Sequence, residues 1–285
     1  VITDLEFQPD LVWIKCRSND PSHKWFDVIR GGGKVLESDD ASAEETNQEY
    51  GYLSAFNTNG FTLTQGTHGS FPMGNVNHSG RTYVAWCWKA GGSSNTFNVD
   101  GVGYATAAAA GITEGSITPT GASVNTEQGF SIITYTGNGG SGQYVPHGLN
   151  ETPVVIFHKN LSNSANWLVR TTAIDGTIDY AYLNTTAVFS NAGGDYTNAW
   201  TSTKFSIGSD SQSNTNTDSY IAYCWHSVPG YSKIGVYRAN GNANGPYEHT
   251  GFKPAWIMIK NQSNSSAPWY IIDNKRSPVS YTHLT

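Results

Sequence analysis

The sequence predicts an all-β protein built from tandem antiparallel β-sandwich modules. Three observations lead to this fold class. Apolar runs rich in Val, Ile, Thr, Tyr, Phe and Trp alternate with clusters of Gly, Asn, Asp and Ser, a pattern typical of short strands joined by turns. Charged residues make up only 13% of the 285 residues, so the Glu and Lys that long surface helices use are scarce. The third observation is an internal repeat.

Similar octets mark the repeat along the chain: PDLVWIKC from Pro9, PVVIFHKN from Pro153 and PAWIMIKN from Pro254. A tryptophan follows each octet, at Trp25, Trp167 and Trp269, and we expect these rings to occupy equivalent core positions. YVAWCWKA at Tyr83 also returns as YIAYCWHS at Tyr220. The last two octets lie about 100 residues apart, which is the size of a small domain rather than of a solenoid repeat.

The first module is expected over residues 1–92, as a β-sandwich unit that lacks its opening strand. Its strands are expected at 11–16, 25–29, 61–64 and 82–88. Residues 93–128 consist mostly of small side chains, which predicts a linker with too few large apolar residues to build a core.

The second module, residues 129–228, is the complete copy. Its strands are expected at 130–135, 154–158, 167–170, 180–183, 204–207 and 219–225. A third, truncated module is expected over 229–277, with strands at 233–237, 255–260 and 269–272. Residues 278–285, PVSYTHLT, match nothing in the other copies and are interpreted as a non-native tail, with a genuine polar tail as the alternative.

The strand expected at 82–88 is apolar on both faces, since its aromatic residues alternate with small ones. Such a strand belongs in the middle of a sheet, with the core on one side and another layer or a neighbouring module on the other. The copy at 219–225 shows the same pattern.

Composition also limits the class of function. The net charge is −6 and no basic cluster is present, which argues against nucleic-acid binding. No apolar stretch approaches the ~20 residues that cross a bilayer, so we expect no membrane insertion. The three cysteines, Cys16, Cys87 and Cys224, lie in apolar strands and are expected to be free thiols in the core.

An acidic run between Glu37 and Glu45 is the nearest approach to an enzyme motif. The run resembles the pattern Glu-x-Asp-x-x-Glu that jelly-roll glucanases carry on one strand. In this chain, however, the last position of the pattern is Ser42. Since a retaining glycosidase needs two carboxylates across the sugar, we interpret the run as a solvated loop, with a calcium site and catalysis as alternatives. The histidines are scattered, so we predict no catalytic residues, no metal ligands and no cofactor.

A polar loop, NAGGDYTNAWTST, supplies the candidate ligand-binding residues Tyr196, Trp200 and Asp195. Exposed rings beside amides and a carboxylate would form a shallow carbohydrate subsite. The alternative is that the rings pack over the edge of the sandwich. In either case we expect the truncation of Trp200 to alanine to be mild.

Several motifs follow one another in a specific order: FQPDLVWIKCR, KWFDVIRG, NGFTL, SGRTYVAWCWKAGG, GFSIITYTGNG and VPHGLNETPVVIFHKN. Together they resemble a domain of unknown function that recurs, often in tandem, in structural proteins of tailed phages, especially marine ones. That domain is likened to concanavalin-type jelly-roll lectins, so the resemblance implies jelly-roll modules. One departure is His158, which stands at an apolar position of the octet.

The resemblance implies a virion protein of the phage tail or tail fibre, made in the bacterial cytoplasm and assembled with other virion proteins as a homo-oligomer. The leading hypothesis is therefore a non-enzymatic structural and adhesion protein whose loops recognise a host-surface glycan. Alternatives are a string of carbohydrate-binding modules from a secreted enzyme and a jelly-roll glycosidase.

Overall fold

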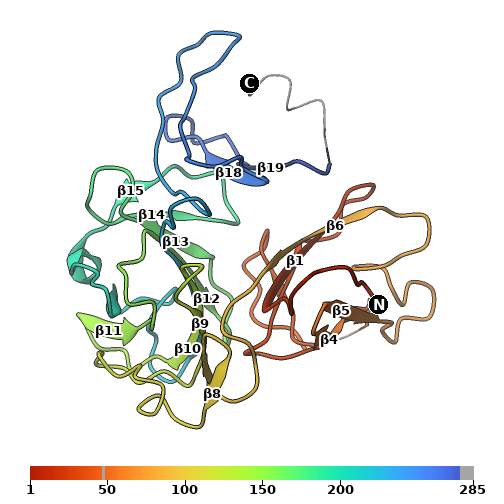
Figure 1. Ribbon diagram of the computed structural model, residues 1–285, viewed down its shortest axis with the longest axis horizontal. Coiled ribbons are helices and arrows are strands. Elements are labelled where there is room, and N and C mark those ends of the chain that lie inside the picture. Colours follow the sequence, from red (N-terminus) through yellow and green to blue (C-terminus); the bar gives the residue numbers. More distant parts are fainter. Residues whose placement is uncertain (47–48, 277–285) are drawn as a thin grey trace.

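The protein is described by a computed structural model that covers residues 1–46 and 49–276 (Figure 1). The strands of the first third are β1 (Leu11–Cys16), β2 (Lys24–Asp27), β3 (Leu36–Glu37), β4 (Tyr52–Asn57), β5 (Gly60–Thr64), β6 (Tyr83–Trp88), β7 (Phe97–Val99) and β8 (Val102–Tyr104). They are followed by β9 (Gly121–Asn125), β10 (Phe130–Thr136), β11 (Gln143–Pro146), β12 (Val155–Asn160), β13 (Leu168–Thr171), β14 (Asp179–Tyr182), β15 (Ser190–Asn191), β16 (Lys204–Ile207), β17 (Ser219–Trp225), β18 (Trp256–Lys260) and β19 (Trp269–Asp273). A single 3-10 turn, η1 (Gly194–Thr197), is the helical element of the described residues. The expected tail at 278–285 lies outside them.

The fold is all-β, with sandwich-like layers. One sheet has the order β3-β2-β1-β6 and a larger one has the order β15-β14-β13-β12-β17-β10-β9-β7-β8. Three two-stranded sheets accompany them, β4-β5, β11-β16 and β18-β19. Within these sheets the pairing is antiparallel except between β7 and β9.

The sequence repeat is a repeat of strand pairing. The octet strand pairs with the next strand on one side and with the Tyr-x-Ala-x-Cys-Trp strand on the other, as β1 does with β2 and β6, and β12 with β13 and β17. The hairpin β18-β19 repeats the first half of this unit. We call the three units the first, second and third repeats.

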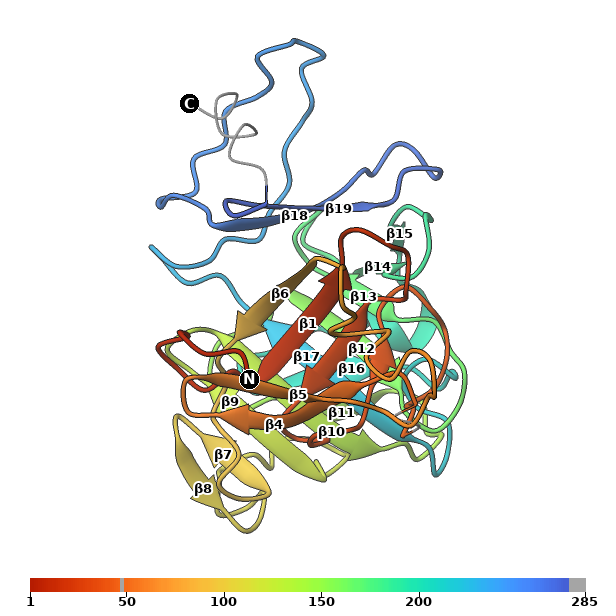
Figure 2. The ribbon, with the colours of Figure 1, turned by 90° about the vertical axis from the view of Figure 1, so that its right-hand side faces the viewer.

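The two aromatic strands differ in their surroundings. β17 lies between β12 and β10, in the middle of its sheet, as predicted. β6 lies at an edge, which corrects the expectation for the strand at 82–88 (Figure 2). The reason is that no strand among the described residues takes the place beside β6 that β10 takes beside β17.

Residues 93–128 differ from the coreless linker expected from their composition. They contain β7, β8 and β9, and β9 is fully buried and pairs with β10. Their few large side chains, including Phe97, Ile112 and Val124, point into one core. Small residues allow close approach: a Cβ on Gly115 would meet the carbonyl oxygen of Tyr144 at 2.8 Å. Small side chains here reflect tight packing of backbones rather than a flexible connection.

Alternating side chains of the octet strands serve two different cores. Val12 and Ile156 face the cores inside their own repeats, which β4-β5 and β11-β16 cover. Trp13 and Phe157 face the opposite way, into a third cluster. The buried members of this third cluster, the shared cluster, are Leu11, Trp13, Trp25, Val28, Leu36, Trp86, Ala90, Phe130, Ile132, Phe157, Trp167, Val169, Leu183, Ile221 and Tyr223. It joins the first and second repeats face to face.

The third repeat packs against the same cluster. Trp256, Met258, Trp269 and Ile271 of β18 and β19 contact it from outside. Figures 1 and 2 show this hairpin beside the sheets of the other two repeats. Because aromatic side chains bury 150–250 Å² each, this cluster is a large source of stability.

Corresponding residues also tie the second repeat to the backbone of the first. Trp167 Nε1 donates to the carbonyl oxygen of Glu37 at 2.7 Å, and Lys159 Nζ donates to that of Ala41 at 2.8 Å. Both donors are fully buried, so the loss of either bond would leave a buried polar group with neither a protein partner nor water to hydrogen-bond.

The third repeat makes the same two contacts with the second. Trp269 Nε1 donates to the carbonyl oxygen of Tyr182 at 3.0 Å, and Lys260 Nζ donates to that of Thr186 at 2.7 Å. The third repeat therefore contacts the second as the second contacts the first.

A further contact joins the first repeat to the third. Trp86 Nε1 donates to Asp273 Oδ2 at 3.2 Å. The second and first repeats make the corresponding contact, in which the Tyr223 hydroxyl donates to Asp27 Oδ2 at 2.7 Å. The three repeats thus contact one another pairwise around the shared cluster.

Trp25 does not occupy the position of the other two repeat tryptophans. Trp269 lies opposite Lys260, the octet lysine, whereas Trp25 lies opposite Trp13. The expected register is wrong for Trp25 because Leu11 pairs with Asp27 just as Val155 pairs with Thr171, and in this shared register His23, two residues before Trp25, takes the place of Trp167. Trp25 nevertheless lies in the shared cluster, 5.2 Å from Trp167 between ring centroids.

Candidate functional site

The candidate rings Tyr196 and Trp200 point into the second repeat. Trp200 is only 6% exposed and belongs to the core beneath β11-β16. The Tyr196 hydroxyl hydrogen-bonds Ser213 Oγ at 2.8 Å, and its ring is half-buried. Asp195 lies in the same turn, η1, and its side chain is outside the described part of the structure. The two rings therefore do not form an exposed platform for a sugar.

What the two rings contact is a buried arginine. The Arg170 guanidinium carbon lies 5.0 Å from the Tyr196 ring centroid and 5.4 Å from that of Trp200. Such cation–π contacts partly compensate the charge for its lost hydration. Burial nevertheless lowers the pKa of Arg170 to about 10. The group stays charged at neutral pH at a cost in stability.

His158, the departure from the octet pattern, is the hydrogen-bond partner of Arg170. Arg170 Nη2 lies 2.9 Å from His158 Nε2, and burial lowers the pKa of His158 well below its usual value. A neutral imidazole beside an obligate donor must accept at Nε2, which assigns the proton to Nδ1, towards the Tyr135 hydroxyl at 3.5 Å. That hydroxyl donates to the Ser213 carbonyl oxygen. The network orders the interior of the sandwich.

The acidic run between Glu37 and Glu45 is spread over separate partners. Four of its five carboxylates pair with cations or accept from backbone amides. The partners are Lys24 for Glu37, the His23 amide for Asp39, the Ser42 amide for Asp40, and Arg30 and Lys34 for Glu44. Within residues 1–46 and 49–276 no three His, Cys, Asp or Glu side chains gather as metal ligands. The run is used to fasten loops of the first repeat.

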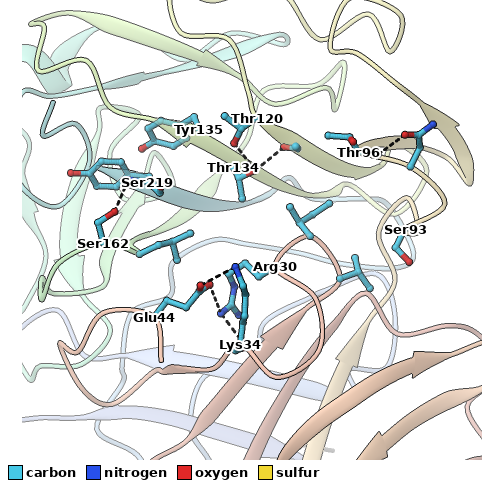
Figure 3. Close-up of a pocket in the computed structure, with 16 residues that line it drawn as sticks. Arg30, Lys34, Glu44, Ser93, Thr96, Thr120, Thr134, Tyr135, Ser162 and Ser219 are labelled. Atoms are coloured by element: carbon cyan, nitrogen blue, oxygen red, sulfur yellow. Dashed lines mark hydrogen bonds and ion pairs between the residues drawn. The ribbon is translucent and has the colours of Figure 1, made fainter. Parts of the chain in front are cut away.

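A cleft of about 470 Å³ lies between the first and second repeats (Figure 3). On one wall Glu44 Oε2 lies 3.4 Å from Arg30 Nη1, and Glu44 Oε1 lies 3.2 Å from Lys34 Nζ. Asp27 holds Arg30 from behind, with Oδ2 2.6 Å from Nε. Because Arg30 and Asp27 are both buried, this pairing fixes the guanidinium in one orientation.

The opposite wall of the cleft is rich in hydroxyl groups. They belong to Ser93, Thr96, Thr120, Thr134, Ser162 and Ser219. Ser162 Oγ accepts from the Ser219 amide at 2.9 Å, and Thr120 Oγ1 lies 3.0 Å from Thr134 Oγ1. Among the described residues the side-chain hydroxyls of Ser219 and Thr96 have no hydrogen-bond partner, so they are available to a ligand.

A family model matches the chain over residues 1–285, and it describes a domain of unknown function, DUF7483. The chain belongs to this family. No curated protein and no solved structure matches the sequence. The family description assigns no activity, so function is inferred from the residues of the chain.

No local pattern in the sequence predicts the cleft. Its walls come from the turn after β2, from the residues on either side of β3, from the segments before β7 and β9, and from the ends of β10, β12 and β17, which lie far apart along the chain. The acidic run, through Glu44, is the sequence feature that reaches the cleft, and its composition predicts a solvated loop. In the described part of this DUF7483 chain, no helix is long and apolar enough to cross a membrane.

Proposed function

We propose that this chain is a non-enzymatic structural and adhesion protein of a phage virion, a component of the tail or tail fibre that displays loops for host-surface recognition. The virion setting is supported by the ordered motifs that resemble tail-protein domains. We further propose that its sandwiches are of the concanavalin-like jelly-roll type and that the protein assembles as a homo-oligomer with other virion proteins.

The observation that carries this proposal is the way the three repeats are fastened together. Corresponding donors, such as Trp167 and Trp269, reach the backbone of the neighbouring repeat, and all three repeats enclose one apolar cluster. A structural component must transmit load without bending between its modules. Modules on a flexible linker would move independently, whereas a shared core makes them one body.

The arrangement of carboxylates favours binding over hydrolysis. Among the described residues that line the cleft, Glu44 is the only carboxylate, and Arg30 and Lys34 engage both of its oxygens. A retaining glycosidase needs two carboxyl groups ~5 Å apart, one of them protonated. Among its described lining residues the cleft offers one carboxylate, without a second one to act as its partner.

The experiment measures adsorption and turnover side by side. The purified chain is incubated with a panel of bacterial strains and with the polysaccharides extracted from them, and cell-bound protein and released reducing ends are both measured. Adsorption without turnover is the expected result. Turnover that disappears in Asp39→Ala or Glu44→Ala would show a glycosidase instead, and the absence of both would contradict an adhesin.

A further inference from the structure

The cleft between the first and second repeats has the chemistry of a ligand site. Its volume of about 470 Å³ lies within the ~300–1,000 Å³ of typical small-molecule pockets. It lies between two bodies that a shared cluster fixes relative to each other. A site of this kind is formed before the ligand arrives, which lowers the entropic cost of binding.

The charges at the cleft cancel in pairs. Arg30 is balanced by Asp27 at 2.6 Å and Lys34 by Glu44 at 3.2 Å, so neither sign is in excess. An anionic ligand would have to displace Glu44 from Lys34, and a cationic one would meet the fixed guanidinium of Arg30. The electrostatics favour a ligand without net charge.

The remaining polar groups are suited to hydroxyl-rich molecules. Ser219 and Thr96 offer hydroxyls that can both donate and accept. The Ser162 hydroxyl accepts from the Ser219 amide and can still donate its own proton to a ligand. The Glu44 carboxylate is held in place and has lone pairs left for two adjacent hydroxyl groups. Apolar side chains, including Ile29 and Leu161, line the same cleft and can pack against C–H groups.

We propose that this cleft binds a neutral saccharide of one or two sugar units, the Glu44 wall accepting from vicinal hydroxyls and the Ser162–Ser219 wall donating to ring and hydroxyl oxygens. The site is distinct from the loop of Tyr196 and Trp200, whose rings are turned inward. The inference deepens the proposed adhesion function and rests on it for its biological setting, while its chemistry rests on the cleft alone.

The test is calorimetric titration of the full chain with a panel of neutral oligosaccharides and, in parallel, with oligogalacturonate as an acidic probe. Thr96→Trp places an indole in the mouth of the cleft from an exposed position. Thr113→Trp is the matched control, since Thr113 is exposed in the same segment and does not line the cleft. Circular dichroism confirms that both variants fold.

The expected result is binding of a neutral oligosaccharide, at least tenfold weaker in Thr96→Trp and unchanged in Thr113→Trp. Preference for oligogalacturonate, equal binding in both variants, or no heat with any member of the panel would each overturn the inference. Cell adsorption that survives in Thr96→Trp would leave the adhesion function standing while removing the cleft as its site.

Discussion

Truncation of Trp167 to alanine should destabilise the first and second repeats together. The side chain is fully buried, its ring centroid lies 5.2 Å from that of Trp25, and Nε1 donates to Glu37 in the first repeat. Removing a buried tryptophan costs about 3–5 kcal/mol, a large part of a typical total stability of about 5–15 kcal/mol. Part of this cost arises because the Glu37 carbonyl oxygen loses its donor.

The conservative change Trp167→Phe separates these two contributions. It keeps most of the ring and removes the indole N–H, so it should cost about 1–3 kcal/mol, the penalty of an unpaired buried carbonyl. Tyr247→Ala is the control, because Tyr247 is 81% exposed and its truncation should change stability by less than about 0.5 kcal/mol.

The assay is urea unfolding followed by far-ultraviolet circular dichroism and by tryptophan fluorescence. The first repeat contributes several buried tryptophans to the fluorescence, so a shared core predicts that both signals shift to lower urea together. A cost below about 1 kcal/mol for Trp167→Ala, or a fluorescence transition that stays in place, would refute the account of Trp167 as a contact between repeats.

Two further predictions concern the interior of the second repeat. Trp200→Ala, expected from the sequence to be mild, should cost about 3–5 kcal/mol because the ring is buried over Arg170, and urea unfolding would measure it. His147 is fully buried, and burial lowers its pKa to about 4 from an ordinary value of 6.5. Since the unfolded chain takes up this proton first, stability should fall as the pH drops from about 6.5 to about 4, and this fall should be smaller in His147→Gln. An unchanged pH profile in that variant, or a mild Trp200→Ala, would contradict these assignments.

The all-β class and the repeat could be predicted because they depend on local patterns. In the octets and in the strand at 219–225, successive side chains point to opposite faces because of the two-residue period of a β-strand. Both faces are apolar, so the sequence predicts a second layer that covers the face turned away from the core. The structure confirms that layer, since Ile221 and Tyr223 face the shared cluster while Ala222 faces the core of its own repeat.

Expectations based on composition alone were wrong where packing is tight. Residues 93–128 contain few large side chains, yet β9 is buried because Gly121, Ala122 and Ser123 let neighbouring backbones approach closely. The polar loop around Trp200 looked solvated for a similar reason. Its ring turns inward because Arg170 needs a partner in the core, and that pairing is long-range.

The position of β6 and the cleft depend on contacts between segments far apart in the sequence. Neither the missing neighbour of β6 nor the position of Glu44 across the cleft from Ser162 and Ser219 has a local signature. Free cysteines, by contrast, followed from their spacing: Cys16, Cys87 and Cys224 are all unpaired thiols.

The most direct test of a shared core is the exposure of Cys16 and Cys224 to a thiol reagent across a urea titration, in a Cys87→Ser background. Cys16 is buried in the first repeat and Cys224 in the second, so each reports on its own unit. Repeats that enclose one cluster unfold together, and both cysteines should become reactive at the same urea concentration. If one cysteine reacts at a concentration where the other stays protected, the repeats are independent modules and the account is contradicted.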